Sequence, residues 1–292
     1  MLIVHDPRCA AYGSSLRPEQ PARVLRTVPY LKGRHPEWTW FDPRETEVAD
    51  ATLLLAHSPA HLRRLVQKED FDGDTPALPE IASHARRAVG GALAAAHYAW
   101  SHRSPAFSLM RPPGHHAMQD QAMGFCYLNS VAVTALAMQA EMGESSAPRV
   151  AVWDFDAHHG NGTQAILRRR PGIFFASVHQ YPGYPGTGTE DEDNCRNWPV
   201  RPQTPRAQHM AALRESWEAV LAFRPDLILV SAGFDAYAQD PITEMTLEAE
   251  DFAELGRWLK AGSIPAAALL EGGYSDDLPA LVDAFLTGWE AE

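Results

Sequence analysis

Two carboxylates and an imidazole recur at every second residue in one short segment of the chain. Asp154, Asp156 and His158 follow the apolar run 150–153, and in an extended chain alternate residues face the same side. Two carboxylates and an imidazole that converge on one point suit a divalent ion such as zinc. The competing interpretation is a capped helix start, in which Asp and Asn side chains accept hydrogen bonds from the first N–H groups. Capping requires neither His158 nor His159, so we favour the metal site.

A third carboxylate follows another apolar run and would complete this site. Asp235 comes after the run 227–230. A site of Asp156, His158 and Asp235 has three protein ligands, which leaves room for water and substrate as in catalytic zinc sites.

Two histidines and a tyrosine also follow apolar runs, and they are suited to proton transfer. His115 and His116 lie in the proline- and glycine-restrained loop 111–117, and Tyr274 follows two glycines. A histidine can take a proton from a metal-bound water and return it to a leaving amine. A phenol can donate to a carbonyl oxygen as negative charge builds there. A structural role for the histidines and a packing role for Tyr274 are the alternatives.

The elements that position these residues are short apolar runs alternating with longer amphipathic segments. This alternation indicates βαβ units and a mostly parallel sheet covered on both faces. Ligands bind beyond the carboxyl ends of the strands in such sheets, and Gly, His, Asp or Tyr clusters follow five of the predicted strands. The predicted strands are 2–4, 38–41, 106–109, 150–153, 173–178, 227–230 and 266–270. The predicted helices are 21–31, 59–67, 79–100, 128–142, 162–169, 208–223, 247–260 and 278–289.

Length and charge restrict the class of protein. The chain has 292 residues, of which 45% are hydrophobic and 21% charged, and its formal net charge is −12. This is the composition of a globular protein with one large domain or two small ones. The acidity argues against a non-specific nucleic-acid binder, which needs a basic face, so we expect no direct nucleic-acid partner. It leaves cationic partners open.

Cysteine usage and hydropathy bear on the compartment. Cys9, Cys126 and Cys195 are too few and too scattered for a disulfide framework or a CxxC zinc site. Neither a secretory signal nor a run of about 18 apolar residues is recognisable, so we expect a cytoplasmic protein with no membrane partner. Cys126 could be a nucleophile, but we expect it to be a small buried thiol beside a helix start.

Several common catalytic and cofactor motifs are missing from the chain. The glycine-rich segments 160–163 and 185–188 match neither a P-loop nor a G-x-G-x-x-G dinucleotide fingerprint. The G-x-S-x-G elbow of serine hydrolases is also missing. The sequence therefore indicates neither a nucleotide cofactor nor a serine nucleophile.

The clusters together resemble the zinc-dependent histone deacetylase and acetylpolyamine amidohydrolase family, in its bacterial-type, class II-like form. The resemblance runs from about Arg17 to about Tyr274, with the motifs in the family's order. It implies an arginase/deacetylase-like three-layer α/β fold, with an eight-stranded, mostly parallel sheet in a single catalytic domain over residues 1–292. The apolar runs locate only seven strands. The motifs are RPPGHHA, GFCYLNSVAV, DFDAHHGNGT, YPGTG, SAGFDA and EGGY.

The resemblance implies two kinds of cation site. Asp156, His158 and Asp235 would be the zinc ligands, with ferrous iron as an alternative metal. The family usually carries monovalent-cation sites as well. Asp154 and Ser177 stand at matching positions for one of these, which would hold K⁺ or Na⁺.

The resemblance also implies roles in proton transfer and carbonyl polarisation. His116 would transfer protons and would be oriented by Asn161. His115 would be its electrostatic partner and would be oriented by Asp154, which hydrogen-bonds to it from outside the ligand set. Tyr274 would polarise the acyl carbonyl.

Further residues at matching positions would shape a tunnel for the acylated amine. Gly124, Phe125 and Tyr184 would line it, and Asp74 would grip the substrate backbone at the rim. Arg23 would line an internal cavity behind the metal. The loops before Arg17 and around 70–79 are short, which predicts an open mouth.

The function implied is metal-assisted amide hydrolysis that removes acyl, expected to be acetyl, groups from amines such as the acetyl-lysine of a peptide or protein. An acetylpolyamine or other small acyl-amide is the alternative substrate. One polyamine-selective branch has Glu after the Asp-Pro pair that follows the metal-binding Asp, but here Ile242 follows Asp240-Pro241. Strict polyamine selectivity is therefore not supported. The oligomeric state is left open.

Two rival functions are less compatible with the sequence. An arginase-like ureohydrolase with two manganese ions needs a D-x-H-x-D pattern, and here Gly160 occupies the last position. A pseudo-enzyme that binds acylated chains without turnover would be expected to lack a metal ligand, a histidine of the pair or the tyrosine. All of these residues are present.

Overall fold

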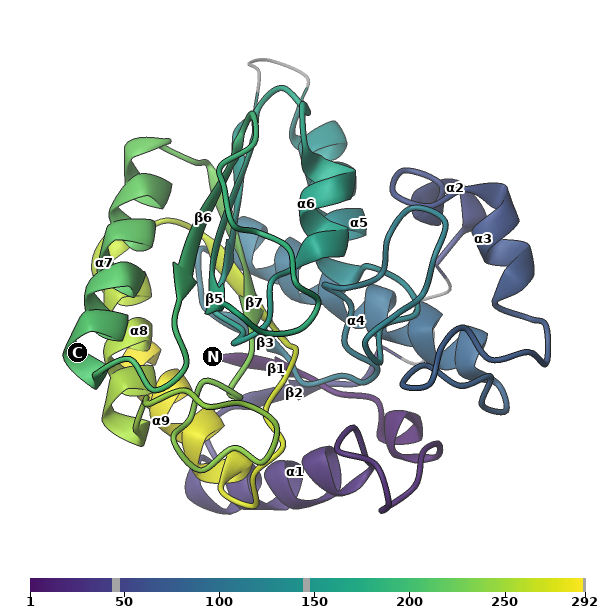
Figure 1. Cartoon of the computed structure of the whole chain (residues 1–292), viewed down its shortest axis with the longest axis horizontal. Coiled ribbons are helices and arrows are strands. Elements are labelled where there is room, and N and C mark those ends of the chain that lie inside the picture. Colours follow the sequence, from purple (N-terminus) through teal and green to yellow (C-terminus); the bar gives the residue numbers. More distant parts are fainter. Residues whose placement is uncertain (44–47, 144–147, 291–292) are drawn as a thin grey trace.

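One parallel β-sheet forms the centre of the protein (Figure 1). The structure is a computed structural model that describes residues 1–43, 48–143 and 148–290. Its strands pair in the order β2-β1-β3-β8-β7-β4-β5-β6, and all neighbouring pairs are parallel. The predicted α/β fold with an eight-stranded sheet is thus confirmed. The strands are β1 (Leu2–Val4), β2 (Thr39–Phe41), β3 (Ala106–Ser108), β4 (Val150–Asp154), β5 (Ile173–Gln180), β6 (Cys195–Val200), β7 (Leu227–Ala232) and β8 (Ala266–Leu270).

The central strands are buried on both faces, which explains why they can be found from apolar runs. Every residue of β3, β4, β7 and β8 is buried. Helical crossovers cover both sides of a parallel sheet, so its strands are apolar throughout rather than alternating. The seven predicted strands are all present, with ends that differ from the prediction by at most two residues.

The one strand of this sheet that the apolar runs do not locate is β6. This strand pairs only with β5 and forms an edge of the sheet. Its four interior residues are exposed or half-buried, and they include Pro199, which lacks an N–H and is tolerated at sheet edges. A mixed polar sequence at a sheet edge has no apolar run by which it could be recognised.

Helices cover both faces of the sheet, and each face has its own core. The helices α1, α7, α8 and α9 lie on one side of the sheet, and α4, α5 and α6 lie on the other (Figure 1). Ala151 and Trp153 of β4 belong to the first core, whereas Val150 and Val152 belong to the second. All eight predicted helices are present, and α2 and the 3-10 helix η1 are additional. The helices are η1 (Pro7–Ala10), α1 (Ala22–Arg34), α2 (Asp50–Leu53), α3 (Pro59–Arg64), α4 (Ile81–His102), α5 (Ser130–Met142), α6 (Asn161–Leu167), α7 (Arg206–Ala222), α8 (Ala249–Gly262) and α9 (Leu278–Glu290).

Within residues 1–43, 48–143 and 148–290, none of the helices combines the length and the apolar character that crossing a bilayer requires.

The helices α8 and α9 approach each other closely at two glycines. A Cβ at Gly256 would collide with the carbonyl oxygen of Phe285 and lie 2.7 Å from the Trp289 nitrogen. A Cβ at Gly288 would likewise collide with the carbonyl oxygen of Ala253. Backbone atoms cannot move aside as side chains can, so both positions require glycine.

Replacing Gly256 by Ala is expected to destabilise the protein despite the better helix propensity of alanine. Overpacking at the α8–α9 contact should lower the free energy of unfolding by about 1 to 3 kcal/mol. The matched control is Gly33→Ala in α1, where the new Cβ meets no heavy atom within 4 Å; this change should stabilise by about 0.5 to 1 kcal/mol. Urea unfolding of both variants checks the pair, and equal shifts of the same sign would contradict the packing argument.

Candidate functional site

The carboxyl ends of the parallel strands bring five loops to one edge of the sheet. These loops follow β3, β4, β5, β7 and β8, as predicted for the residue clusters. The candidate residues that they carry are His115 and His116, Asp156 and His158, Tyr184, Asp235 and Tyr274.

Asp156, His158 and Asp235 form a tight cluster at this edge. One candidate ligand atom from each lies within 4.8 Å of the other two. The Nδ1 atom of His158 is 2.8 Å from Asp235 Oδ2 and 3.2 Å from Asp156 Oδ1. Backbone amides hold the other carboxylate oxygens: Gly272 N–H donates to Asp156 Oδ2 (2.7 Å) and Ala157 N–H donates to Asp235 Oδ1 (2.8 Å). The cluster is therefore oriented from three loops.

The donor set of this cluster fits a divalent metal ion. Asp156 and Asp235 are completely buried. Burial, followed by the negative charge of Asp156, raises the pKa of Asp235. Neighbouring buried carboxylates carry excess negative charge that a divalent cation neutralises. Carboxylate and imidazole are ligand types that zinc takes, and three protein ligands leave a position for water or substrate.

Glycines allow the chain to pass close to the two carboxylates. A Cβ at Gly272 would collide with the Oδ2 atom of Asp235 and approach Asp156, and a Cβ at Gly233 would collide with Asp156. Neither site would accept even alanine without displacement of a candidate ligand. Gly233 of the SAGFDA motif and Gly272, the first glycine of the EGGY motif, are thus required by the cluster.

A second group of candidate metal ligands, His115, Cys126 and Glu271, is satisfied without an ion. Glu271 Oε2 accepts hydrogen bonds from the backbone N–H groups of Gly114 (2.7 Å) and His115 (3.2 Å). The Nδ1 atom of His115 faces Asp154. Burial raises the pKa of the Cys126 thiol well above its ordinary value. Cys126 is a small buried thiol, as expected from the sequence.

Asn161 orients the ring of His116. The Nδ1 atom of His116 lies 2.8 Å from Asn161 Oδ1, and the Asn161 amide nitrogen donates to Met123 Sδ (3.4 Å). The Asn161 oxygen can only accept, so Nδ1 of His116 carries the proton and Nε2 is free to accept one. Burial, with the nearby His115 and His158, lowers the pKa of His116 well below its ordinary value. His116 is therefore neutral.

Asp154 lies beside both His115 and Ser177. Its Oδ2 atom is 3.1 Å from His115 Nδ1, and its Oδ1 atom accepts the Asp156 N–H at 3.1 Å. Burial alone would lower the pKa of His115, but the Asp156 and Asp154 carboxylates raise it to about 10. Ser177 is the register partner of Asp154 on β5, and its hydroxyl lies 2.9 Å from His179 Nδ1.

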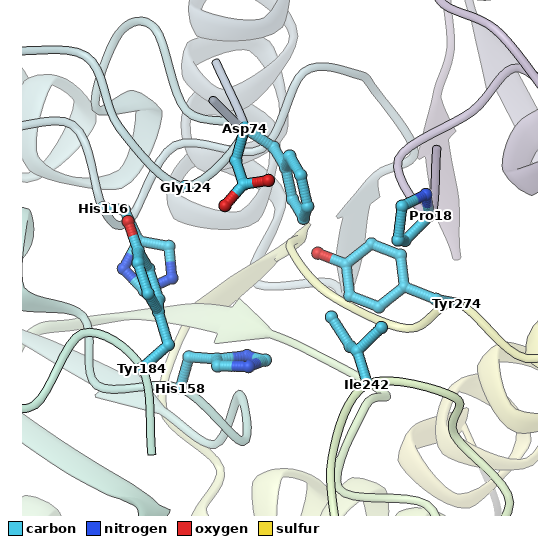
Figure 2. Close-up of a pocket in the computed structure, with 9 residues that line it drawn as sticks. Pro18, Asp74, His116, Gly124, His158, Tyr184, Ile242 and Tyr274 are labelled. Carbon is cyan, nitrogen blue, oxygen red and sulfur yellow. The ribbon is translucent and has the colours of Figure 1, made fainter. Parts of the chain in front are cut away.

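The phenol of Tyr274 points into a cavity, toward the side where His116 and His158 lie (Figure 2). The Arg23 guanidinium lies 4.8 Å from the centre of the Tyr274 ring, and its Nε donates to the Gly273 carbonyl oxygen (2.8 Å). Burial raises the pKa of Tyr274 well above its ordinary value, with Arg23 acting in the opposite direction. The phenol therefore keeps its proton and can donate a hydrogen bond.

The cavity has a volume of about 280 Å³ and is lined by all the residues predicted to contact substrate (Figure 2). Two further lining residues, Pro18 and Ile242, were not predicted as site residues. Both could have been proposed as lining residues from their neighbours in the sequence. Ile242 follows the Asp-Pro pair after Asp235, and Pro18 follows Arg17. The lining residues are Pro18, Asp74, His116, Gly124, Phe125, His158, Tyr184, Ile242 and Tyr274.

Comparison with known proteins gives a consistent set of relatives. The family model described as histone deacetylase domain matches residues 17–288. A probable deacetylase of Methanothermobacter thermautotrophicus is 34% identical over 100% of this chain and 91% of its own length. A histone deacetylase-like amidohydrolase of Pseudomonas aeruginosa is 38% identical over 78% of this chain and 64% of its own. The crystal structure of an acetylpolyamine aminohydrolase from Burkholderia pseudomallei superimposes with a TM-score of 0.90 at 26% identity, covering 100% of this chain and 99% of that one.

Removing one carboxylate from the cluster is expected to abolish metal binding. We expect Asp235→Asn to retain less than about one tenth of the divalent ion that the unchanged protein holds, because one of the two anionic residues in the three-residue set is lost. Elemental analysis by mass spectrometry after gel filtration measures the metal content. Asp283→Asn is the control, since Asp283 is a buried carboxylate on α9 that pairs with Arg34. Equal metal content in the two variants would contradict the assignment.

Proposed function

The chain belongs to the histone deacetylase family, whose members are metal-dependent amide hydrolases, and from this premise we propose that it removes acetyl groups from cationic amines such as acetyl-lysine. The observation that supports the proposal most strongly is the meeting of three side chains in one cavity. His116, His158 and Tyr274 all line it, and they come from the loops after β3, β4 and β8. A general base, a metal ligand and a hydrogen-bond donor are the groups that amide hydrolysis requires.

We propose zinc as the ion held by Asp156, His158 and Asp235, because two carboxylates and one imidazole match its ligand preferences. When bound there, the ion would polarise the substrate carbonyl and make a neighbouring water more acidic. Ferrous iron is the alternative, and metal analysis of the protein separates the two. Asp154 and Ser177, which are register partners on β4 and β5, are proposed to take part in a K⁺ or Na⁺ site.

We propose that His116 moves the proton in this reaction. Its Nδ1–H is directed to Asn161, so Nε2 is the atom that accepts a proton from the attacking water. The same atom then returns the proton to the leaving nitrogen, which departs as a free amine. His115, held by Asp154 at 3.1 Å, is the charged neighbour that stabilises negative charge in the site.

Tyr274 is proposed to stabilise the transition state at the opposite side of the cavity. Its neutral phenol donates a hydrogen bond to the carbonyl oxygen as that oxygen becomes negative. A fixed donor contributes most when it requires no rearrangement during the reaction. Arg23 supports this geometry because it contacts both the Tyr274 ring and the Gly273 carbonyl oxygen.

The mouth of the cavity favours an amine substrate with further positive charge. Asp74 lines the cavity, and it lies in the loop 69–74, which also carries Glu69, Asp70 and Asp72. We propose the acetyl-lysine of a peptide or protein as the substrate, with Asp74 contacting its backbone. An acetylated polyamine is the second candidate because relatives bear that name. The ratio of kcat/KM for acetyl-lysine peptides and acetylated polyamines decides between them.

Two further features complete the proposal. Residues 1–292 form one catalytic domain, which the single sheet supports. The compartment is a reducing cytoplasm, with which the three unpaired and buried thiols are compatible.

Removing the base or the phenol is expected to reduce turnover without loss of the metal. His116→Ala should lower kcat by about 10²- to 10⁴-fold, and Tyr274→Phe by about 10²- to 10³-fold. A fluorogenic acetyl-lysine assay measures kcat, and elemental analysis verifies that the metal content is retained. Full activity in both variants would refute the proposed roles.

A methyl group at Gly124 is expected to obstruct the cavity. The Cβ of Gly124→Ala would lie 2.5 Å from His116 Cδ2 and 3.0 Å from Tyr184 Cε1, at a backbone φ of +56°. We expect kcat/KM to fall at least about tenfold, because small displacements of reacting groups are costly. Gly186→Ala is the control: Gly186 also has a positive φ (+83°), but its added Cβ meets nothing within 4 Å. Equal losses of kcat/KM would point to backbone strain instead.

A further inference from the structure

The long loop between β7 and α8 connects the metal cluster to the opposite wall of the cavity. It begins beside Asp235 and is closed at its base by two backbone hydrogen bonds, from Ala238 N–H to Leu247 O (2.8 Å) and from Leu247 N–H to Ala236 O (3.0 Å). Asp240 lies within the closed part of this loop and is only 6% exposed. A buried carboxylate needs hydrogen-bond partners, and those of Asp240 define its role.

Both oxygens of Asp240 accept hydrogen bonds from the backbone of residues that line the cavity. Oδ2 accepts the N–H of Tyr274 at 2.8 Å, and Oδ1 accepts the N–H of Ile242 at 3.1 Å. The backbone N–H of Asp240 donates to Tyr237 O at 3.0 Å, which holds the main chain that carries the carboxylate. One side chain thus sets the positions of two cavity walls.

The two residues before Tyr274 are glycines, which restrict the backbone less than any other residue, so the position of Tyr274 depends on hydrogen bonds. Gly272 and Gly273 precede it, and Gly273 has a φ of +113°. Gly272 N–H is held by Asp156 and the Gly273 carbonyl by Arg23. The backbone N–H of Tyr274 itself donates to the Asp240 carboxylate.

We infer that Asp240 is a positioning residue for Tyr274, an inference that rests on the proposed function. Asp240 is neither a member of the Asp156–His158–Asp235 cluster nor one of the residues that line the cavity. It acts by holding the tyrosine backbone at the distance from which the phenol reaches the carbonyl oxygen. A misplacement of about 1 Å at a reacting group can cost about 10²-fold in rate.

The substitution Asp240→Asn replaces one of the two accepting carboxylate oxygens by an NH₂ group. In Asp240→Asn, the amide NH₂ group must face either the Tyr274 N–H or the Ile242 N–H, where two donors repel. We expect kcat to fall about 10- to 100-fold, whereas KM changes less than about threefold. Asp240→Ser, which also lacks the two-oxygen acceptor but is smaller, is the second variant in case the first does not fold.

The double variant with Tyr274→Phe distinguishes positioning from general damage. If Asp240 acts through the phenol, Asp240→Asn should lower kcat less than about twofold when Tyr274 is already Phe. An equal loss in both backgrounds would overturn the inference, and so would an Asp240→Asn enzyme as fast as the unchanged one. Thermal unfolding of each variant verifies that the compared proteins are folded.

Asp251 provides a matched control. It is also 6% exposed, and its Oδ2 accepts a backbone N–H, that of Glu248, at 2.8 Å. Its partners lie at the start of α8 and on Arg206. Asp251→Asn should lower the unfolding temperature but leave kcat within about twofold of the unchanged enzyme. A loss of kcat equal to that of Asp240→Asn would overturn the inference.

Hydrogen exchange tests the anchor without any enzyme assay. Asp240→Asn should accelerate amide exchange in a peptide covering 272–276 at least about fivefold, whereas Asp251→Asn should not. Unchanged exchange in Asp240→Ser, which lacks both carboxylate oxygens, would overturn the inference. If Tyr274→Phe retained full activity, the proposed role of the phenol would fail, and the exchange rates would still decide whether Asp240 holds this loop.

Discussion

Two carboxylates, Asp156 and Asp235, are buried side by side, and the arrangement of the whole site depends on holding them there. Like charges in a low-dielectric interior repel and lack water, so each oxygen needs a donor or a cation. The protein supplies backbone N–H groups from Ala157 and Gly272, together with the His158 ring. Glycine at 233 and 272 lets the main chain approach closely enough for this contact. A bound cation completes the balance.

The parallel sheet makes this arrangement possible. The candidate metal ligands and the residues proposed for proton transfer are far apart in sequence, but they follow strands that all end at one edge of the sheet. The loops are also linked to one another: Glu271, at the end of β8, accepts hydrogen bonds from the backbone of Gly114 and His115 in the loop after β3. The Tyr274 loop and the histidine loop are therefore held together by a single buried side chain.

Much of this architecture could be predicted from the sequence, for identifiable reasons. The buried strands are apolar throughout, and Asp156, His158 and Asp235 follow strand ends at recognisable spacings. The edge strand β6 could not be found, because Pro199 and its half-exposed neighbours leave no hydrophobic pattern. The link from Asp240 to Tyr274 could not be found either. It joins residues 34 positions apart through a side chain bonding to a backbone amide, and such contacts leave no periodicity.

The cavity is lined by segments that are held in place by different hydrogen bonds. Pro18 and Asp74 belong to surface loops that precede α1 and α4, and these loops touch each other where Arg17 donates to the Gly73 carbonyl oxygen. Ile242 shares the Asp240 carboxylate with Tyr274. Substitutions at positions 18 and 74 therefore change the cavity wall without altering the hydrogen bonds that hold Tyr274. A shift of the backbone at Ile242, by contrast, would also move the Asp240 carboxylate that holds Tyr274. A mutation there would therefore change the shape of the cavity and the position of the phenol together.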